Sequence, residues 1–135
     1  MASELILEIV TPFGEIFNEP IVCCTLPGTN GRFQVLKGHT ALMSTIEIGS
    51  VKIEFTDAKP AYVAVSSGFC EVKDDRVKII VESAEFSGKI DVERAESSKK
   101  RAEERLSLKS ADLDLDRTKA SLMRALNRLK VSSFK

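Results

Sequence analysis

Hydrophobic and polar residues alternate along the first two thirds of the chain, in short segments that end at turn residues. Residues 51–55 alternate strictly, with apolar side chains separated by Lys and Glu, and residues 5–9 and 77–81 show the same period of two. The sequence Pro27-Gly28-Thr29-Asn30-Gly31 is a strong turn signal between two such segments. Seven or more short strands at this spacing predict an antiparallel sandwich or barrel that ends near residue 86.

The period of the apolar positions changes near residue 88, from two to between three and four. The glycines all lie at or before Gly88 and the prolines at or before Pro60, so the remaining chain lacks the two strongest helix breakers. The buried side of a first helix is predicted to hold Val92, Ala95, Lys99, Ala102 and Leu106. The buried side of a second helix is predicted to hold Leu115, Thr118, Leu122, Leu126 and Leu129.

Polar residues mark the ends of both predicted helices. Asp91 is well placed to cap the N-terminus of the first helix, and residues 107–111 are expected to form a connector. Acidic residues open the second helix, whereas Arg124, Arg128 and Lys130 crowd its end, in agreement with the helix dipole. A short link between two amphipathic helices predicts an antiparallel hairpin.

Together these patterns predict an α+β fold, with an N-terminal antiparallel β-sandwich followed by a C-terminal two-helix antiparallel hairpin. We place the β-sandwich domain at residues 1–87 and the helical hairpin at residues 88–135. The first helix offers mainly alanines to the seam, which bury little area, while ordering each residue costs on the order of 1 kcal/mol. We therefore expect the hairpin to depend on the sandwich, on a partner, or on each in turn.

Composition and charge narrow the class of protein. The 135 residues are 30% charged and 43% hydrophobic, which excludes disordered and collagen-like proteins. The net charge of zero divides into −5 over residues 1–87 and +5 over residues 88–135. The acidic body argues against nucleic-acid binding. No apolar run approaches the roughly 20 residues that cross a bilayer.

Candidate catalytic and metal-binding groups are few. His39 is the one histidine, so no imidazole pair can bind a metal; no obvious Ser-His-Asp set presents itself, and the pattern G-x-x-x-x-G-K-[ST] is missing. Cys23 and Cys24 are adjacent, so on a strand they point to opposite faces. The odd number of cysteines fits a reducing compartment. We predict no catalytic residues and no metal site.

An ordered set of motifs carries a resemblance that covers nearly the whole chain. The motifs are Leu26-Pro27-Gly28-x-x-Gly31, Gly38-His39-Thr40-Ala41-Leu42, Ser67-Gly68-Phe69-x-Glu71-Val72, Ile90-Asp91-x-x-Arg94-Ala95 and Arg124-Ala125-x-Asn127-Arg128-Leu129. In this order they make the chain similar to the epsilon subunit of the F-type, proton-driven ATP synthases, which is called delta in mitochondria.

The resemblance implies a non-catalytic subunit of the central stalk that helps couple proton-driven rotation to ATP synthesis. Its sandwich would contact the gamma subunit and the ring of c subunits. Its hairpin would permit turnover when folded on the sandwich, and would block ATP hydrolysis when extended along gamma toward the catalytic beta and alpha subunits. The implied location is peripheral, at the cytoplasmic face of the bacterial plasma membrane or on the plastid thylakoid.

The same resemblance implies two candidate sites, and it requires no cofactor. The first would hold ATP as a regulatory ligand, through Glu85, Ile90, Asp91, Arg94, Ala95, Arg101, Arg124 and Arg128. The second, formed by Arg32 and His39, would contact the rotor ring. For His39, a turn residue that hydrogen-bonds its own loop is an equally good interpretation.

Other interpretations of the helix arginines stay open. They fit a solvated face with local pairs, a row that docks on an acidic segment of the beta subunit, or a clasp whose mutual repulsion a polyanion relieves. The alternative functions are a free-standing nucleotide-binding sensor and an adaptor domain with an interaction helix.

Overall fold

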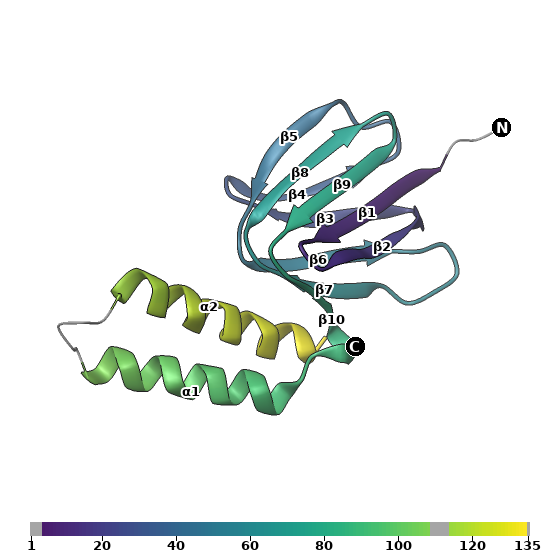
Figure 1. Cartoon of the computed structure of the whole chain (residues 1–135). Helices are drawn as coiled ribbons and strands as arrows, with labels where there is room; N and C mark the ends of the chain where they lie inside the picture. Colours follow the sequence, from purple (N-terminus) through teal and green to yellow (C-terminus); the bar gives the residue numbers. More distant parts are fainter. Residues whose placement is uncertain (1–3, 109–113, 135) are drawn as a thin grey trace.

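The computed structural model describes residues 4–108 and 114–134, which form a β-sandwich and a helical hairpin (Figure 1). The strands are β1 (Leu5–Thr11), β2 (Gly14–Ile21), β3 (Cys23–Gly28), β4 (Gly31–Leu36), β5 (Leu42–Ile46), β6 (Gly49–Glu54), β7 (Ala61–Val65), β8 (Gly68–Lys73), β9 (Arg76–Val81) and β10 (Ala84–Phe86). A 3₁₀ turn, η1 (Ser87–Lys89), leads to the helices α1 (Val92–Leu108) and α2 (Leu115–Ser132). The α+β fold class is confirmed.

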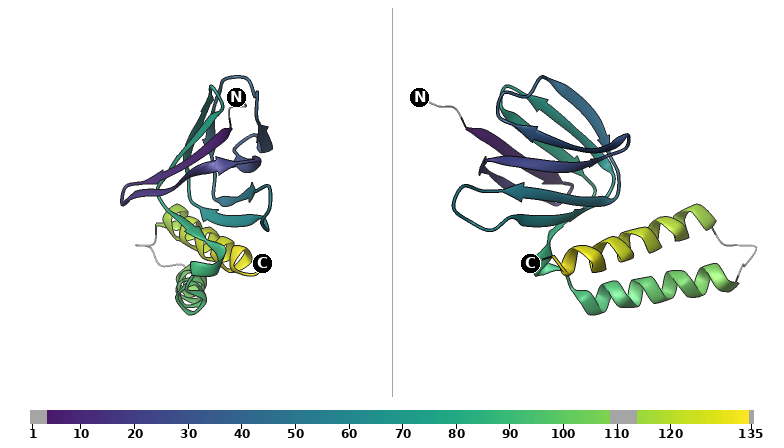
Figure 2. Two further views of the ribbon diagram at one scale, coloured as in Figure 1. Left: turned by 90° about the vertical axis from the view of Figure 1, so that its right-hand side faces the viewer. Right: turned by 180° about the vertical axis from the view of Figure 1, so that it is seen from behind.

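One continuous sheet builds the sandwich. Its strands follow the order β10-β7-β6-β3-β5-β8-β9-β1-β2, with β4 paired to β3, and the sheet folds into two layers (Figure 2). The two ends of the sheet meet through aromatic side chains, because Phe17 of β2 lies 5.8 Å from Phe86 of β10, between ring centroids. This contact closes the sandwich at the end from which the hairpin leaves.

The expectation of a purely antiparallel sandwich is wrong at one pairing. Among the strand pairs of the described residues, β1 with β9 is parallel, and Ile9 lies opposite Ile79. Parallel neighbours need a long crossover, which the intervening strands supply here. Such a pairing between distant segments leaves no trace in the local alternation from which the strands were predicted.

The core lies between the two layers of the sandwich. The largest buried side chains are aliphatic and come from alternate positions of β1, β3, β6, β7 and β9, for example Leu7, Leu26, Ile53, Val63 and Ile79, each fully buried. The period of two therefore places one face of each strand in the core, as the sequence predicts.

Both helices begin with an aspartate cap. The amide of Arg94 donates to Oδ1 of Asp91 at 3.0 Å, which confirms the predicted cap, and the amide of Arg117 donates to Oδ1 of Asp114 at 3.0 Å. The expected connector at residues 107–111 is partly wrong, because Ser107 and Leu108 belong to α1. Residues 109–111 lie outside the described part of the chain. Neither described helix is long and apolar enough to cross a membrane.

The seam between α1 and α2 consists of small side chains. Ala95 and Ala102 of α1 and Thr118 and Ala125 of α2 are its buried residues. The predicted leucine stripe of α2 is wrong in part, because Leu115 and Leu126 are 48% and 44% exposed. Alanine and threonine allow the helices to pack closely, so the leucines lie beside the seam or outside it.

The hairpin joins the sandwich at the end of α2, whereas the C-terminal end of α1 and the N-terminal end of α2 lie away from it (Figures 1 and 2). Val131 is fully buried against Ala64 and Ile90, and Phe134 packs on Tyr62 with ring centroids 4.9 Å apart. Asn127 adds a side-chain hydrogen bond from Nδ2 to the carbonyl oxygen of Gly49, at 2.8 Å. The apolar part of this contact is small.

Candidate functional site

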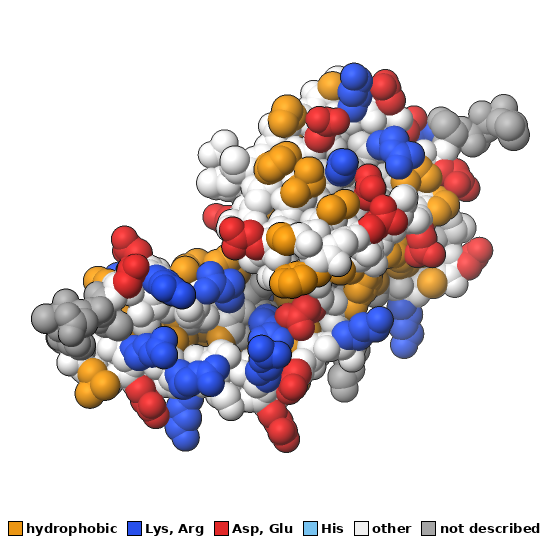
Figure 3. All heavy atoms as spheres, viewed as in Figure 1, with side chains coloured by type: hydrophobic (Ala, Val, Ile, Leu, Met, Phe, Trp, Pro, Cys, Tyr) orange, Lys and Arg blue, Asp and Glu red, His pale blue; other side chains and the backbone are white. Residues whose placement is uncertain are grey.

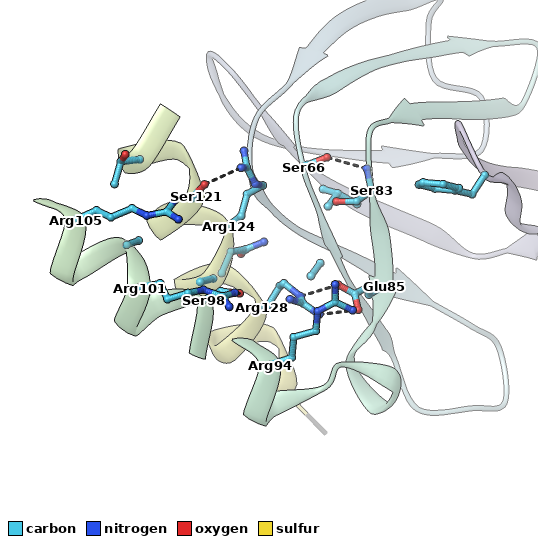
Figure 4. Close-up of a pocket in the computed structure, with 17 residues that line it drawn as sticks. Ser66, Ser83, Glu85, Arg94, Ser98, Arg101, Arg105, Ser121, Arg124 and Arg128 are labelled. Atoms are coloured by element: carbon cyan, nitrogen blue, oxygen red, sulfur yellow. Dashed lines mark hydrogen bonds and ion pairs between the residues drawn. The ribbon is translucent and has the colours of Figure 1, made fainter. Parts of the chain in front are cut away.

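A cavity of about 760 Å³ separates the helical hairpin from the sandwich. Its hairpin wall is formed by side chains of α1 and α2, and its sandwich wall by residues of β7 and β10 and the segments beside them (Figure 4). The lining residues are Phe13, Ala64, Val65, Ser66, Ser83, Glu85, Arg94, Ser98, Arg101, Ala102, Arg105, Thr118, Ser121, Arg124, Ala125, Asn127 and Arg128. This size suits a small organic ligand.

Five arginines line the cavity, and all of them come from the hairpin: Arg94, Arg101, Arg105, Arg124 and Arg128. Their spacing within each helix places them on one side, at about 100° per residue. Figure 3 shows Lys and Arg side chains gathered over the hairpin on the face turned to the viewer. The cavity therefore offers a concentration of positive charge along one wall.

Glu85 is the one carboxylate in the lining, and it pairs with Arg128. Nε of Arg128 lies 2.7 Å from Oε1 of Glu85, and Nη2 donates to Oε2 at 3.1 Å. The pair joins α2 to β10, and its side chains are 22% and 34% exposed. A two-point contact of this kind fixes the orientation of the guanidinium.

The other four arginines have no carboxylate within 4 Å among the described residues. Arg101 donates to the hydroxyl of Ser98 at 3.2 Å, and Arg124 to the hydroxyl of Ser121 at 3.1 Å, each within its own helix. The local carboxylate pairs expected for a solvated face are therefore not formed by these arginines. These four charges line the same cavity without a carboxylate partner among residues 4–108 and 114–134.

The structure brings together five of the eight residues predicted for ATP: Glu85, Arg94, Arg101, Arg124 and Arg128 all line the cavity. The other three support it from outside. Ile90 is buried beside Val131, Asp91 caps α1, and Ala95 lies in the helix seam.

Sequence reasoning missed several lining residues. Arg105 follows Arg101 by four positions, so the helical period could have identified it. Asn127 lies three positions after Arg124 on the same helix, so the same period could have identified it. Ser66 and Ser83 could not be found in this way, because they reach the cavity from the sandwich. The hydroxyl of Ser66, which is 4% exposed, accepts a hydrogen bond from the amide of Ser83 at 2.8 Å.

Arg32 and His39, predicted to share one contact surface, lie at opposite ends of β4, Arg32 within its first residues and His39 beyond its last. Arg32 is at the start of β4, beside the β3–β4 turn, and donates from Nη1 to the carbonyl oxygen of Ser50 at 2.9 Å. His39 follows the other end of β4, and its Nδ1 lies 2.7 Å from the carbonyl oxygen of Thr40. The contact of His39 with its own loop matches the plainer of its two interpretations. The structure does not bring the two residues together.

The cysteines lie in the sandwich, away from the cavity. Cys24 and Cys70 are fully buried, and burial raises the pKa of the Cys24 thiol to about 12. Burial, followed by the hydrogen bond to Glu54 at 2.8 Å, also raises the pKa of Cys23. These thiols are protonated and function as small apolar side chains at neutral pH.

Comparisons with known proteins identify the family. Residues 4–87 match the β-sandwich domain of the ATP synthase delta/epsilon chain, and residues 89–133 match its long α-helix domain. The chain is 39% identical over 131 residues to the ATP synthase epsilon chain of Desulforapulum autotrophicum, with 97% of each chain covered. It is 42% identical over 133 residues to that of Staphylococcus saprophyticus, with 98% of each covered.

A solved structure shares the fold. The match is to a chain of the Euglena gracilis mitochondrial ATP synthase, OSCP/F1/c-ring in rotational state 1, with a TM-score of 0.76 and 20% sequence identity. It covers 100% of the present chain and 84% of that chain. The family matches span both domains and the relatives match end to end. The chain therefore belongs to the ATP synthase delta/epsilon chain family.

Proposed function

We propose that the chain is a non-catalytic subunit of the central stalk of an F-type ATP synthase. The family assignment supports this role over a free-standing sensor or an adaptor domain. A second structural neighbour, described as the central stalk and c-ring of the Tetrahymena thermophila mitochondrial enzyme, has the same fold at a TM-score of 0.68. The sandwich would contact the gamma subunit and the c-subunit ring, at the cytoplasmic face of a bacterial plasma membrane or on a plastid thylakoid.

The helical hairpin is proposed to regulate ATP hydrolysis by leaving the sandwich. Its small seam and its small apolar contact with β6, β7 and η1 favour a docked state of low stability. In the extended state the hairpin would exchange these contacts for others along gamma and the beta and alpha subunits. Two states that bury similar apolar surfaces differ by a few kcal/mol, so a ligand can shift their populations.

The cavity between hairpin and sandwich is the proposed site for ATP. The observation that carries this proposal is the row of five arginines, four of them without a carboxylate partner in the described chain, facing a cavity of about 760 Å³. Arginine guanidiniums bind phosphate oxygens in a two-point geometry. Because the cavity has walls from both domains, a bound polyphosphate would hold the hairpin docked.

Contact with the rotor ring is proposed separately for Arg32 and for His39. They lie at opposite ends of β4, so each is treated as a separate candidate contact. Cross-linking from each position within the assembled synthase tests them independently. A cross-link from one position and not the other identifies the end of the sandwich that faces the ring.

Binding is tested by calorimetric titration of the full chain with MgATP. Arg124→Ala should weaken binding by about tenfold, the cost of one charged hydrogen-bonding partner. Arg117→Ala is the matched control, since Arg117 is an exposed arginine of α2 that does not line the cavity. Absence of heat at millimolar MgATP, or equal effects of the two variants, would contradict the proposed site.

Regulation is tested by removing residues 88–135 from the chain and assembling the remainder with the other synthase subunits. The proposal predicts intact assembly with faster ATP hydrolysis. Unchanged hydrolysis in a correctly assembled complex would show that the hairpin does not inhibit.

A further inference from the structure

The first residues of β6 are held by side chains from two elements that are far apart in the sequence. The carbonyl oxygen of Gly49 accepts from Nδ2 of Asn127, in α2, at 2.8 Å. The carbonyl oxygen of the next residue, Ser50, accepts from Nη1 of Arg32, in β4, at 2.9 Å. The docked hairpin and the β3–β4 hairpin therefore bind neighbouring peptide groups of one strand.

The register of the sheet explains why side chains are used here. The pairing of β3 with β6 ends at Thr25 opposite Lys52, and the same register would place Pro27 opposite Ser50. Proline has no N–H to donate, so it cannot extend the ladder. Arg32 lies opposite Pro27 in the pairing of β3 with β4, and its guanidinium supplies a donor at this point.

The backbone of Gly49 is closely packed against Pro27. A Cβ built on Gly49 would lie 2.7 Å from Cβ of Pro27, so the backbone of Gly49 is in direct contact with the start of the β3–β4 turn. The amide of Glu47 also donates to the carbonyl oxygen of Pro27 at 3.0 Å. The amide of Thr29 donates to the carbonyl oxygen of Thr45 at 3.1 Å. Close-packed groups of this kind move together rather than independently.

We propose that Gly49 and Ser50 form a shared anchor that couples the β3–β4 turn to docking of α2. While Arg32 binds Ser50, the carbonyl of Gly49 is held where Asn127 can reach it. If the exposed guanidinium of Arg32 is captured by an acidic group of a partner, Ser50 is released and α2 docks less tightly. By linkage, undocking of α2 weakens the bond between Arg32 and Ser50 to the same degree.

The coupling is measured on the full chain without nucleotide. A negative result for the coupling therefore says nothing about the proposed ATP site, and the two proposals can fail separately. Tyr62 is the one tyrosine, and Phe134 packs on its ring only while α2 is docked. The NMR shifts of the Tyr62 ring protons during a urea titration therefore report the docking equilibrium. Asn127→Ala, which removes the direct bond, should lower the docking constant by about fivefold.

Arg32→Ala should lower the same docking constant by about threefold, although Arg32 makes no hydrogen bond or ion pair with α2 among the described residues. Arg76→Ala is the matched control, since Arg76 is an exposed arginine that starts β9, and it should leave docking unchanged. Equal docking in Arg32→Ala and Arg76→Ala would overturn the proposal. In the double variant Arg32→Ala/Asn127→Ala, the two losses should be less than additive, and strict additivity would also overturn it.

Discussion

Arg128 and Glu85 form a two-point ion pair that ties the second helix to the last strand of the sandwich, with Nε 2.7 Å from Oε1 and Nη2 3.1 Å from Oε2. Both residues line the cavity, so the pair belongs to the docking contact and to the proposed ligand site at once. A ligand that competes for Arg128 must replace the bond to Glu85 with its own oxygens.

The strength of this pair is accessible to a double-mutant cycle. Because both side chains are partly exposed, at 22% and 34%, we expect Glu85→Ala and Arg128→Ala to show a coupling energy of about 1 kcal/mol in hairpin docking. The Tyr62 ring shifts provide the measurement. A coupling energy near zero would show that the pair does not contribute to docking.

Arginine crowding should destabilise the hairpin when the cavity is empty. Replacing Arg101 with Gln removes one cation from the row, so thermal unfolding at low salt should show a gain of a few tenths of a kcal/mol without ligand. The same variant should lose most of the stabilisation that MgATP gives. Lys100→Gln, at an exposed position beside it that does not line the cavity, is the control and should show neither effect.

Gly68 should tolerate no side chain. A Cβ at this position would overlap the carbonyl oxygen of Ile80 and lie 2.8 Å from Cα of Val81, both of them backbone atoms of the neighbouring strand. We expect Gly68→Ala to lower the free energy of unfolding by roughly 3 kcal/mol. Gly88→Ala, where a Cβ meets no atom within 4 Å, should change it little, and equal effects in urea denaturation would contradict this account.

The buried thiol of Cys24 should make the fold sensitive to alkaline pH. Burial raises its pKa from 9.0 in the unfolded chain to about 12, so the folded state favours the neutral thiol. This contribution is complete below pH 9 and is lost as the pH rises from 9 toward 12. At pH 10.5 the loss amounts to about 2 kcal/mol.

Replacing Cys24 with Val removes this ionisation and keeps an apolar side chain in the core. Urea denaturation at pH 8 and pH 10.5 should show that the parent chain loses more stability than Cys24→Val over this interval. If the two proteins lose stability in parallel, ionisation of Cys24 makes no contribution.

Local pattern was sufficient to predict the strand class of the sandwich and the two helices that follow it. The alternation at residues 51–55 and 77–81 identified strands, and the absence of Gly and Pro after Gly88 identified the helices. Pairings between distant segments cannot be predicted from local pattern, which is why the parallel contact of β1 with β9 was not expected. Leu126 was misplaced because hydrophobicity does not reveal that a seam of alanine and threonine packs more closely than one of leucine.

The part of the site that lies on a single helix face could be predicted from the sequence. The part formed where different elements meet was predicted less well. The resemblance to the family implied Arg94, Arg101, Arg124 and Arg128, whereas the sandwich wall with Ser66 and Ser83 required the fold. Arg32 and His39 were expected to act together because the resemblance implied that both contact the rotor ring. A strand extends about 3.3 Å per residue, so Arg32, at the start of β4, is separated from His39, beyond its end, by the rest of the strand.

The central claim is that the hairpin is weakly docked and that a polyphosphate in the cavity holds it in place. Hydrogen exchange of the full chain with and without MgATP tests it most directly. We predict fast exchange in α1 and α2 relative to the sandwich strands without ligand, and at least tenfold slower exchange in both helices at saturating MgATP. Helices protected as strongly as the sandwich core, with no response to MgATP, would contradict the claim.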